Sequence, residues 1–129
     1  MTKIQLIGLP GAGKTSAIHL YNEKHPEHLY KLLDIVDYKS LDREYKFLSD
    51  IKSETLDTLA ESACGVYYPP TVNIQIDPSI DVIFRNLRTR GDDIDVEYLA
   101  GLKRQMIASH YTIRSSEELI PLLNTLFKK

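Results

Sequence analysis

Short apolar runs alternate with longer segments of helical periodicity along this chain. Five short runs of apolar or β-branched residues have the length and boundaries of strands. They lie at Lys3–Ile7, Leu29–Leu33, Thr58–Cys64, Val72–Ile76 and Tyr111–Arg114. Helical spacing predicts five helices at Thr15–Lys24, Ser40–Leu56, Ser79–Arg90, Asp95–His110 and Ser116–Leu126. Strands that alternate with helices in this way predict an α/β fold with a parallel sheet.

Two of the expected helices carry further signals. The helix at 40–56 has Ser40 as its expected N-cap and a stripe of apolar side chains. The stripe consists of Leu41, Tyr45, Leu48, Ile51 and Leu56. The last helix begins at Ser115 or Ser116, with Glu118 near its first turn, which predicts a capping box.

Size and composition narrow the classes of function. A chain of 129 residues suits one domain, 1–129, and no apolar run approaches the roughly 20 residues that span a bilayer. A net charge of −2 and a pI near 6.1 argue against a general nucleic-acid partner. The N-terminal apolar stretch is too short for a signal peptide, and the single Cys64 cannot form an internal disulfide. We therefore expect a cytoplasmic protein that has neither a membrane nor a nucleic-acid partner.

The stretch GLPGAGKT, Gly8 to Thr15, matches the phosphate-loop pattern GxxxxGK[ST] at every fixed position. Glycines let the backbone turn its N–H groups toward a phosphate chain, and the following helix adds its positive N-terminal dipole. A simple glycine turn is the alternative, but a strand before the loop and a helix after it favour the phosphate loop. The expected nucleotide-binding residues are Gly8, Pro10, Gly11, Ala12, Gly13, Lys14, Thr15 and Ser16. The predicted ligand is ATP with Mg²⁺, in which Lys14 contacts the β- and γ-phosphates and Thr15 ligates the metal.

An arginine-rich segment follows the fourth expected strand. Arg85, Arg88 and Arg90 crowd the end of the helix, and cations there could clamp a transferring phosphoryl group. The other interpretation is a solvated basic helix end that pairs with Asp92 and Asp93. Together with the phosphate loop, the segment favours a lid over residues 85–95.

GLPGAGKTS, a strand that ends in Asp-Pro, and IFRNLRTRG followed by VEYLAGL resemble the deoxynucleoside and thymidylate kinase group of P-loop kinases. The resemblance implies a three-layer P-loop NTPase fold, a five-stranded parallel sheet with helices on both faces, and transfer of the ATP γ-phosphoryl group to a nucleoside or nucleotide. It also implies a base at the end of the second strand, which fits Asp34. Asp37 is the competing residue, and a pair of this kind is typical of small-metabolite kinases.

The chain departs from that group in the residues expected to bind the molecule that accepts the phosphoryl group. The families carry an arginine at the end of the third strand, where this sequence has Glu61 followed by serine. Glu61 could hold Mg²⁺ through water, contact the acceptor, or form an ordinary salt bridge. Arg43 and Glu44 could face the acceptor in compensation, or could simply begin a helix. The segment between the second and third strands is short, which fits a small acceptor or an exposed one completed by the second subunit of a homodimer.

Three functions therefore stay open. The first is a nucleoside or nucleotide kinase with Lys14, Asp34, Arg85, Arg88 and Arg90 as catalytic residues. The second is a kinase of a small non-nucleotide metabolite, in which Asp34 and Asp37 both contact acceptor hydroxyls. The third is a nucleotide-binding regulatory protein with little transfer activity.

Overall fold

A five-stranded parallel sheet forms the centre of the computed structural model, which describes residues 1–127. The strands are β1 (Lys3–Ile7), β2 (Lys31–Asp34), β3 (Thr58–Ser62), β4 (Val72–Ile76) and β5 (Tyr111–Ile113). Their order in the sheet is β2-β3-β1-β4-β5, so β1 lies between β3 and β4. The last two residues of the expected domain 1–129 lie outside the described part of the chain.

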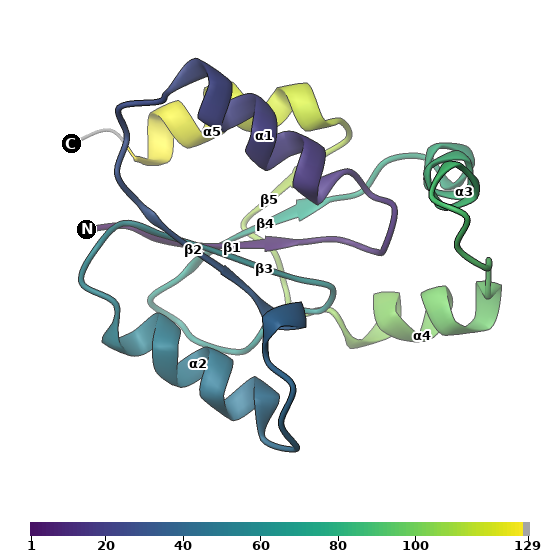
Figure 1. The fold of residues 1–129 in the computed structure, drawn as a ribbon, viewed down its shortest axis with the longest axis horizontal. Helices are drawn as coiled ribbons and strands as arrows, with labels where there is room; N and C mark the ends of the chain where they lie inside the picture. Colours follow the sequence, from purple (N-terminus) through teal and green to yellow (C-terminus); the bar gives the residue numbers. More distant parts are fainter. Residues whose placement is uncertain (128–129) are drawn as a thin grey trace.

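The helices cover both faces of the sheet and extend beyond one of its ends (Figure 1). Their bounds are α1 (Lys14–Lys24), α2 (Arg43–Ser53), α3 (Ile80–Thr89), α4 (Val96–Gln105) and α5 (Leu119–Leu126). Helices α1 and α5 lie together on one face and α2 lies on the other, whereas α3 stands beyond the carboxyl ends of the strands. This arrangement confirms the expected α/β fold with a five-stranded parallel sheet and helices on both faces.

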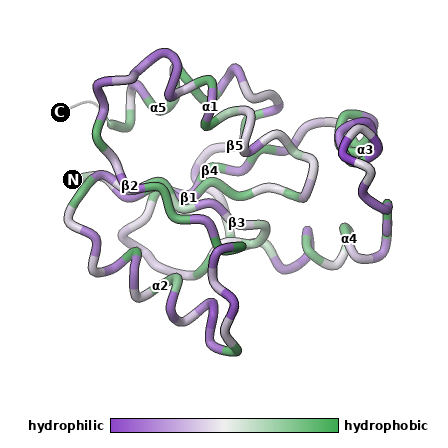
Figure 2. Tube along the Cα trace, in the orientation of Figure 1, coloured by the Kyte–Doolittle hydropathy of each residue, from purple (hydrophilic) through white to green (hydrophobic). Residues whose placement is uncertain are grey.

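Hydrophobic residues are frequent along the central strands (Figure 2), and three clusters of buried side chains form the core. Between the sheet and the α1–α5 face, Ile4, Leu6 and Ile74 pack against Ala17 and Leu123. A second cluster centres on Phe47 and Ile51 of α2, and a third joins Leu9 to Ile83, Leu87 and Leu99 at the carboxyl end. The third cluster matters for the site, because it packs α3 against the loop that follows β1.

The start of α2 differs from the prediction. The helix begins at Arg43 rather than at Ser40, and Leu41 and Tyr45 of the expected apolar stripe are exposed. The buried face of α2 is formed by Ile51, a member of the stripe, and by Phe47, which the stripe did not include. Ser40 does not cap the helix, and its buried hydroxyl has no hydrogen-bond partner among residues 1–127. The stripe was right for Ile51, which is buried, and for Leu48, which packs against the Phe47 cluster, but Leu41 lies in the turn before the helix and Tyr45 on its exposed side.

Other boundaries lie within a few residues of their predicted positions. Helix α4 is shorter than expected: the side chain of Asp95 accepts a hydrogen bond from the Tyr98 amide at its start, and the helix ends at Gln105. The predicted capping box is confirmed, because the Glu118 carboxylate accepts from the Ser115 amide at 2.8 Å and the Ser115 hydroxyl caps the turn in return. A 3-10 turn at Ser116–Glu118 precedes α5.

The connection from β3 to β4 runs as a loop through residues 63–71 across one face of the sheet. Gln5, a buried residue in the middle of β1, holds this loop. Its side-chain amide donates to the Val66 carbonyl at 2.7 Å and to the Thr71 hydroxyl at 3.0 Å, and its oxygen accepts from the Val66 amide at 2.9 Å. Buried polar groups of a loop need such partners, and here one strand residue supplies several of them.

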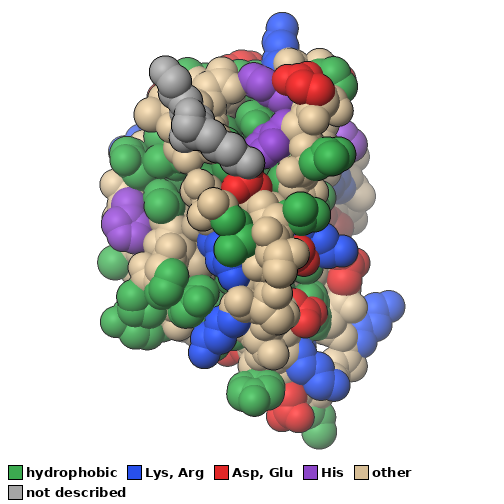
Figure 3. All heavy atoms as spheres, turned by 90° about the vertical axis from the view of Figure 1, so that its left-hand side faces the viewer, with side chains coloured by type: hydrophobic (Ala, Val, Ile, Leu, Met, Phe, Trp, Pro, Cys, Tyr) green, Lys and Arg blue, Asp and Glu red, His purple; other side chains and the backbone are tan. Residues whose placement is uncertain are grey.

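Polar contacts also fasten the amino ends of the strands. The Tyr21 hydroxyl is 2.5 Å from His28 Nδ1, and His28 Nε2 is 3.0 Å from a carboxylate oxygen of Asp57. The other oxygen of Asp57 accepts from the Thr2 amide at 2.8 Å. Figure 3 looks onto this end of the molecule, where histidine, charged and hydrophobic side chains are mixed. These contacts hold the N-terminal residues at the amino ends of the strands, at the opposite end of the sheet from the phosphate loop.

Candidate functional site at the carboxyl ends of the strands

The predicted phosphate loop connects β1 to α1. Gly11 and Gly13 have φ angles of 85° and 98°, in the left-handed region that favours glycine. A Cβ atom on Gly11 would lie 2.9 Å from the Ile83 carbonyl oxygen, and one on Gly13 would lie 2.7 Å from the Ser116 hydroxyl. Conformation and space therefore both require glycine at these two positions.

Hydrogen bonds hold the loop from several sides. The Gly8 amide donates to the Ser62 carbonyl at 3.3 Å, and the Ala12 amide donates to Leu9 at 2.9 Å. The Asn86 side chain donates to the Gly11 carbonyl at 2.7 Å. On the other side, the Ser116 hydroxyl donates to the Gly13 carbonyl at 3.0 Å.

Lys14 is the first residue of α1 and folds back over the loop. Its ammonium group donates to the Gly8 carbonyl and, at 3.4 Å, to the Leu9 carbonyl. Burial lowers the pKa of Lys14, while the negative charges of Glu61 and Asp34 raise it again. Thr15 and Ser16 lie exposed in the first turn of the same helix, and Pro10 is half-buried in the loop.

Asp34 is the last residue of β2, Glu61 is the last but one of β3, and the two are partners in the register of these strands. Glu61 is buried, and burial raises its pKa to about 7, helped by the charge of Asp34 and opposed by Lys14. Asp37 acts on Glu61 in the same direction more weakly. Asp34 is half-buried and accepts a hydrogen bond from the Val36 amide at 3.1 Å. The sheet thus brings two predicted carboxylates and Lys14 together at one edge.

The three arginines of the expected lid region are all exposed. The positive charge of Arg90 lowers the pKa of Lys14, so Arg90 lies near the loop, and it also pairs with Asp92 at 3.0 Å. The Arg88 guanidinium lies 6.0 Å from the centre of the Phe84 ring. Arg85 is on the same helix, one turn before Thr89, whose hydroxyl donates to the Arg85 carbonyl. The ion pair with Asp92 was the alternative that the sequence had left open for this helix end.

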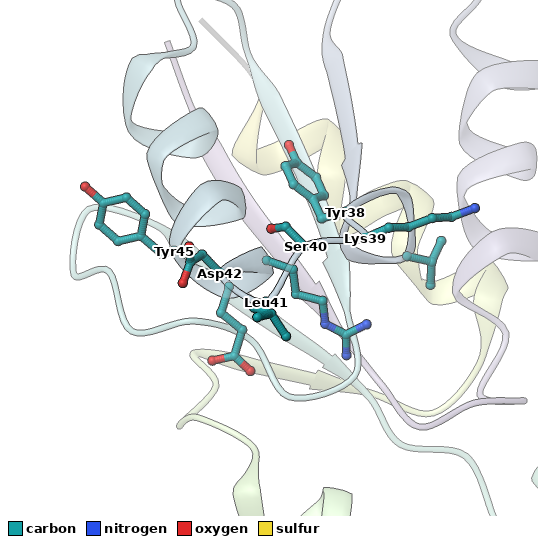
Figure 4. Close-up of a pocket in the computed structure, with 9 residues that line it drawn as sticks. Tyr38, Lys39, Ser40, Leu41, Asp42 and Tyr45 are labelled. Carbon is teal, nitrogen blue, oxygen red and sulfur yellow. The ribbon is translucent and has the colours of Figure 1, made fainter.

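A hollow of about 770 Å³ opens beside the start of α2 (Figure 4). Val36 and residues 38–45 line it, including Arg43 and Glu44. Burial, and then the charge of Glu44, raise the pKa of Cys64, which follows β3. Arg43 lines this hollow and is also the first residue of α2, which is the helix start that the sequence offered as the alternative.

Comparison with solved structures places this arrangement among known folds. A sugar kinase from Janibacter superposes with a TM-score of 0.67 over 98% of this chain and 94% of its own, at 13% identity. Shikimate kinase from Acinetobacter baumannii, in complex with shikimate, gives 0.64 over 100% and 96% at 15% identity. A gluconokinase from Sinorhizobium meliloti gives 0.63 over 93% and 87% at 12% identity.

These likenesses show the fold alone, which the chain shares with a sugar kinase, a shikimate kinase and a gluconokinase. No model of a protein family matches the sequence. No curated protein matches it either. The nucleoside and thymidylate kinases that the sequence resembles are not among the structures described above, and the likeness is instead to kinases named for sugars and small acids.

The donor groups suit a magnesium ion that arrives with a nucleotide. Residues 1–127 contain no cluster of three or more histidine, cysteine or acidic side chains that could cage a metal. Mg²⁺ in nucleotide sites is typically held by one or two protein groups, phosphate oxygens and water. Exposed Thr15 at the loop and Glu61 at the neighbouring strand end fit such a partial set. In the same described range, no helix is long and apolar enough to cross a membrane.

Two side-chain hydrogen bonds to the phosphate loop were not predicted from the sequence. Asn86 lies between the predicted lid arginines, and Ser116 appeared only as a helix start, yet both donate to loop carbonyls. Their spacing in the sequence carries no signal, because each bond joins residues 75 or 103 positions apart. Only the folded chain shows that these side chains surround the loop.

Proposed function

We propose that this protein transfers the terminal phosphoryl group of ATP to a hydroxyl group of a small non-nucleotide metabolite. The observation that supports this proposal is the juxtaposition of Lys14 with the Asp34 and Glu61 carboxylates. A phosphate loop with its lysine supplies a donor half, and carboxylates beside it supply a group that can receive the proton of an acceptor hydroxyl.

The donor half rests on backbone geometry. The left-handed Gly11 and Gly13 let the loop amides face a phosphate chain, and the N-terminus of α1 adds a positive dipole. Lys14 would exchange its bonds to the loop carbonyls for bonds to phosphate oxygens. Bound Mg²⁺ would neutralise phosphate charge, with Thr15 holding it and Glu61 contacting it through water.

The acceptor half rests on the two carboxylates. Asp34, the less buried of the two, would take the hydroxyl proton as the new oxygen–phosphorus bond forms and the bond to ADP breaks. Glu61 holds a proton near neutral pH, because its pKa is raised to about 7. Arg90, with Arg85 and Arg88 on the same helix end, would close over the transferring group.

A polyhydroxylated acceptor fits the hollow beside α2. Its lining carries the charged side chains of Lys39, Asp42, Arg43 and Glu44, which are suited to hydroxyl and carboxylate groups. The solved structures include kinases named for shikimate and gluconate, which supports the same class of acceptor. Asp37, next to the hollow, would contact a second hydroxyl.

A nucleoside acceptor is the second candidate, and one aromatic side chain favours it. Tyr45 lines the hollow and is exposed, so its ring could stack on a base. Tyr38 is already committed, because its hydroxyl donates to Asp50 at 2.5 Å and its ring packs edge-on against Phe47. One free ring without a partner on the other side is weaker support than the charged lining.

Labelled ATP with a panel of neutral sugars, sugar acids, nucleosides and nucleoside monophosphates tests both candidates. We expect a sugar or sugar acid to accept phosphate, and we expect Lys14→Ala and Asp34→Asn to lower kcat/KM by about 100-fold or more. Asp81→Asn, an exposed carboxylate on α3, is the matched control for charge removal.

The other possible results of this assay each support a different conclusion. Phosphorylation of a nucleoside alone would favour the second candidate. Tight ATP binding without any acceptor would leave the regulatory protein as the better interpretation. Failure to bind ATP would contradict the phosphate-loop assignment itself.

A further inference from the structure

Helix α3 packs directly against the phosphate loop. Leu9 of the loop is buried among Ile83, Leu87 and Leu99. The space beside Gly11 is filled by the Ile83 carbonyl and the Leu87 side chain, which would lie 2.9 and 3.1 Å from a Cβ atom. The loop and the helix are thus in direct contact at this point.

One directional bond crosses this contact. The Asn86 amide nitrogen donates to the Gly11 carbonyl oxygen at 2.7 Å, across 75 positions of sequence. Gly11 is buried, so its carbonyl has little access to water and needs a protein donor. The amide of a side chain is well suited, because it is neutral and donates along a fixed direction.

The direction of that carbonyl matters for anion binding. A phosphate nest needs successive backbone N–H groups turned inward, which requires the neighbouring carbonyls to turn outward. The Gly11 carbonyl and the Ala12 amide belong to one peptide group, whose oxygen accepts from Asn86 while its N–H donates to the Leu9 carbonyl at 2.9 Å. Without Asn86, only the bond from the Ala12 amide to Leu9 would hold this peptide, and a rotation would present negative oxygen to the phosphates.

We infer that Asn86 is a positioning residue for the phosphate loop: by holding the Gly11 carbonyl outward it sets the loop for polyphosphate binding and ties the arginine-bearing helix α3 to the donor site. The inference rests on the donor role of the loop proposed above. It places no reacting group on Asn86, which acts through Gly11 alone.

The test compares variants of Asn86 by their affinity for inorganic tripolyphosphate and for ATP with Mg²⁺, measured by calorimetry. Asn86→Ala removes the donor, and we expect an affinity about five- to tenfold lower. Asn86→Asp keeps the shape but offers a carboxylate oxygen to the carbonyl, and we expect a loss greater than that of Asn86→Ala. Asn86→Gln keeps an amide and should retain more affinity than Asn86→Ala, which a merely structural role would not produce.

Asn124→Asp is the matched control. Asn124 is exposed and lies near the C-terminal end of α5, and Asn86 lies near the C-terminal end of α3. The control therefore reproduces the effect of a negative charge near a helix C-terminus. Urea unfolding without ligand shows whether each variant is folded. If Asn86→Asp does not fold, the comparison of Asn86→Ala with Asn86→Gln decides instead.

The outcomes separate this inference from the proposed function. Wild-type affinity in Asn86→Ala and Asn86→Asp, with binding lost in Lys14→Ala, would overturn the role of Asn86 and leave the donor loop intact. An equal loss in Asn86→Asp and Asn124→Asp would also overturn it. A wild-type protein that binds neither tripolyphosphate nor ATP would overturn both.

Discussion

The raised pKa of the buried Glu61 makes the free energy of unfolding depend on pH, which can be measured. Burial, and then the charge of Asp34, raise its pKa from 4.5 to about 7. A raised carboxyl pKa means that the folded state favours the protonated form. Its stabilising contribution is therefore complete below about pH 4.5 and is lost as the pH rises through about 7. At about 1.4 kcal/mol per pKa unit, this loss is about 3 kcal/mol in the free energy of unfolding.

Glu61→Gln removes this titration and keeps a neutral side chain of similar shape. We expect the free energy of unfolding of the variant, relative to that of the wild type, to rise by about 3 kcal/mol as the pH increases from about 4.5 to about 8. Urea unfolding at a series of pH values measures the difference, and taking the difference cancels the contributions of the four histidines.

Glu23→Gln, an exposed carboxylate on α1, controls for the loss of a charge. A free-energy difference between Glu61→Gln and wild type that stays constant across this range would refute the reasoning. It would mean that Glu61 ionises as readily in the folded protein as in the unfolded chain.

Three further substitutions test the packing around the site, each by urea unfolding at neutral pH. Phe47→Ala leaves a cavity under α2, where the ring is fully buried, and should cost about 3–5 kcal/mol. Gln5→Leu leaves buried groups of loop 63–71 without their partner and should cost about 1–3 kcal/mol, whereas a neutral result would mean that the loop needs no such anchor. Gly13→Ala places a side chain on a residue whose φ is 98° and brings its Cβ to 2.7 Å from the Ser116 hydroxyl, which should cost roughly 1–3 kcal/mol. Adding Ser116→Gly should recover only the part of this cost that comes from the clash with the hydroxyl.

The phosphate loop was predictable because its chemistry is local. Glycine spacing, the lysine and the flanking strand and helix all lie within one stretch, and the structure places Gly11 and Gly13 in the conformation that the pattern requires. The alternation of strands and helices likewise predicted the parallel sheet. Both follow from neighbours along the chain.

The acceptor half was less predictable because it depends on strand order. Asp34 and Glu61 are 27 positions apart, and they meet only because β2 and β3 are neighbours in the sheet. The sequence named both residues but offered Glu61 several roles, and the pairing that raises its pKa appears only in the fold. Helix α2 shows the opposite limit, since Leu41 and Tyr45 fit an apolar stripe and yet lie exposed on a turn and beside the hollow.

The two carboxylates can divide their roles because their surroundings differ. Two ionised carboxylates on adjacent strands repel each other, so the pair favours a state in which one of them holds a proton. Glu61 is the more buried and loses more by ionising, whereas Asp34 is half-buried and its charge accepts a backbone N–H. Asp34, the less buried of the two, is therefore the carboxylate that in the proposed reaction would accept a proton from an acceptor hydroxyl.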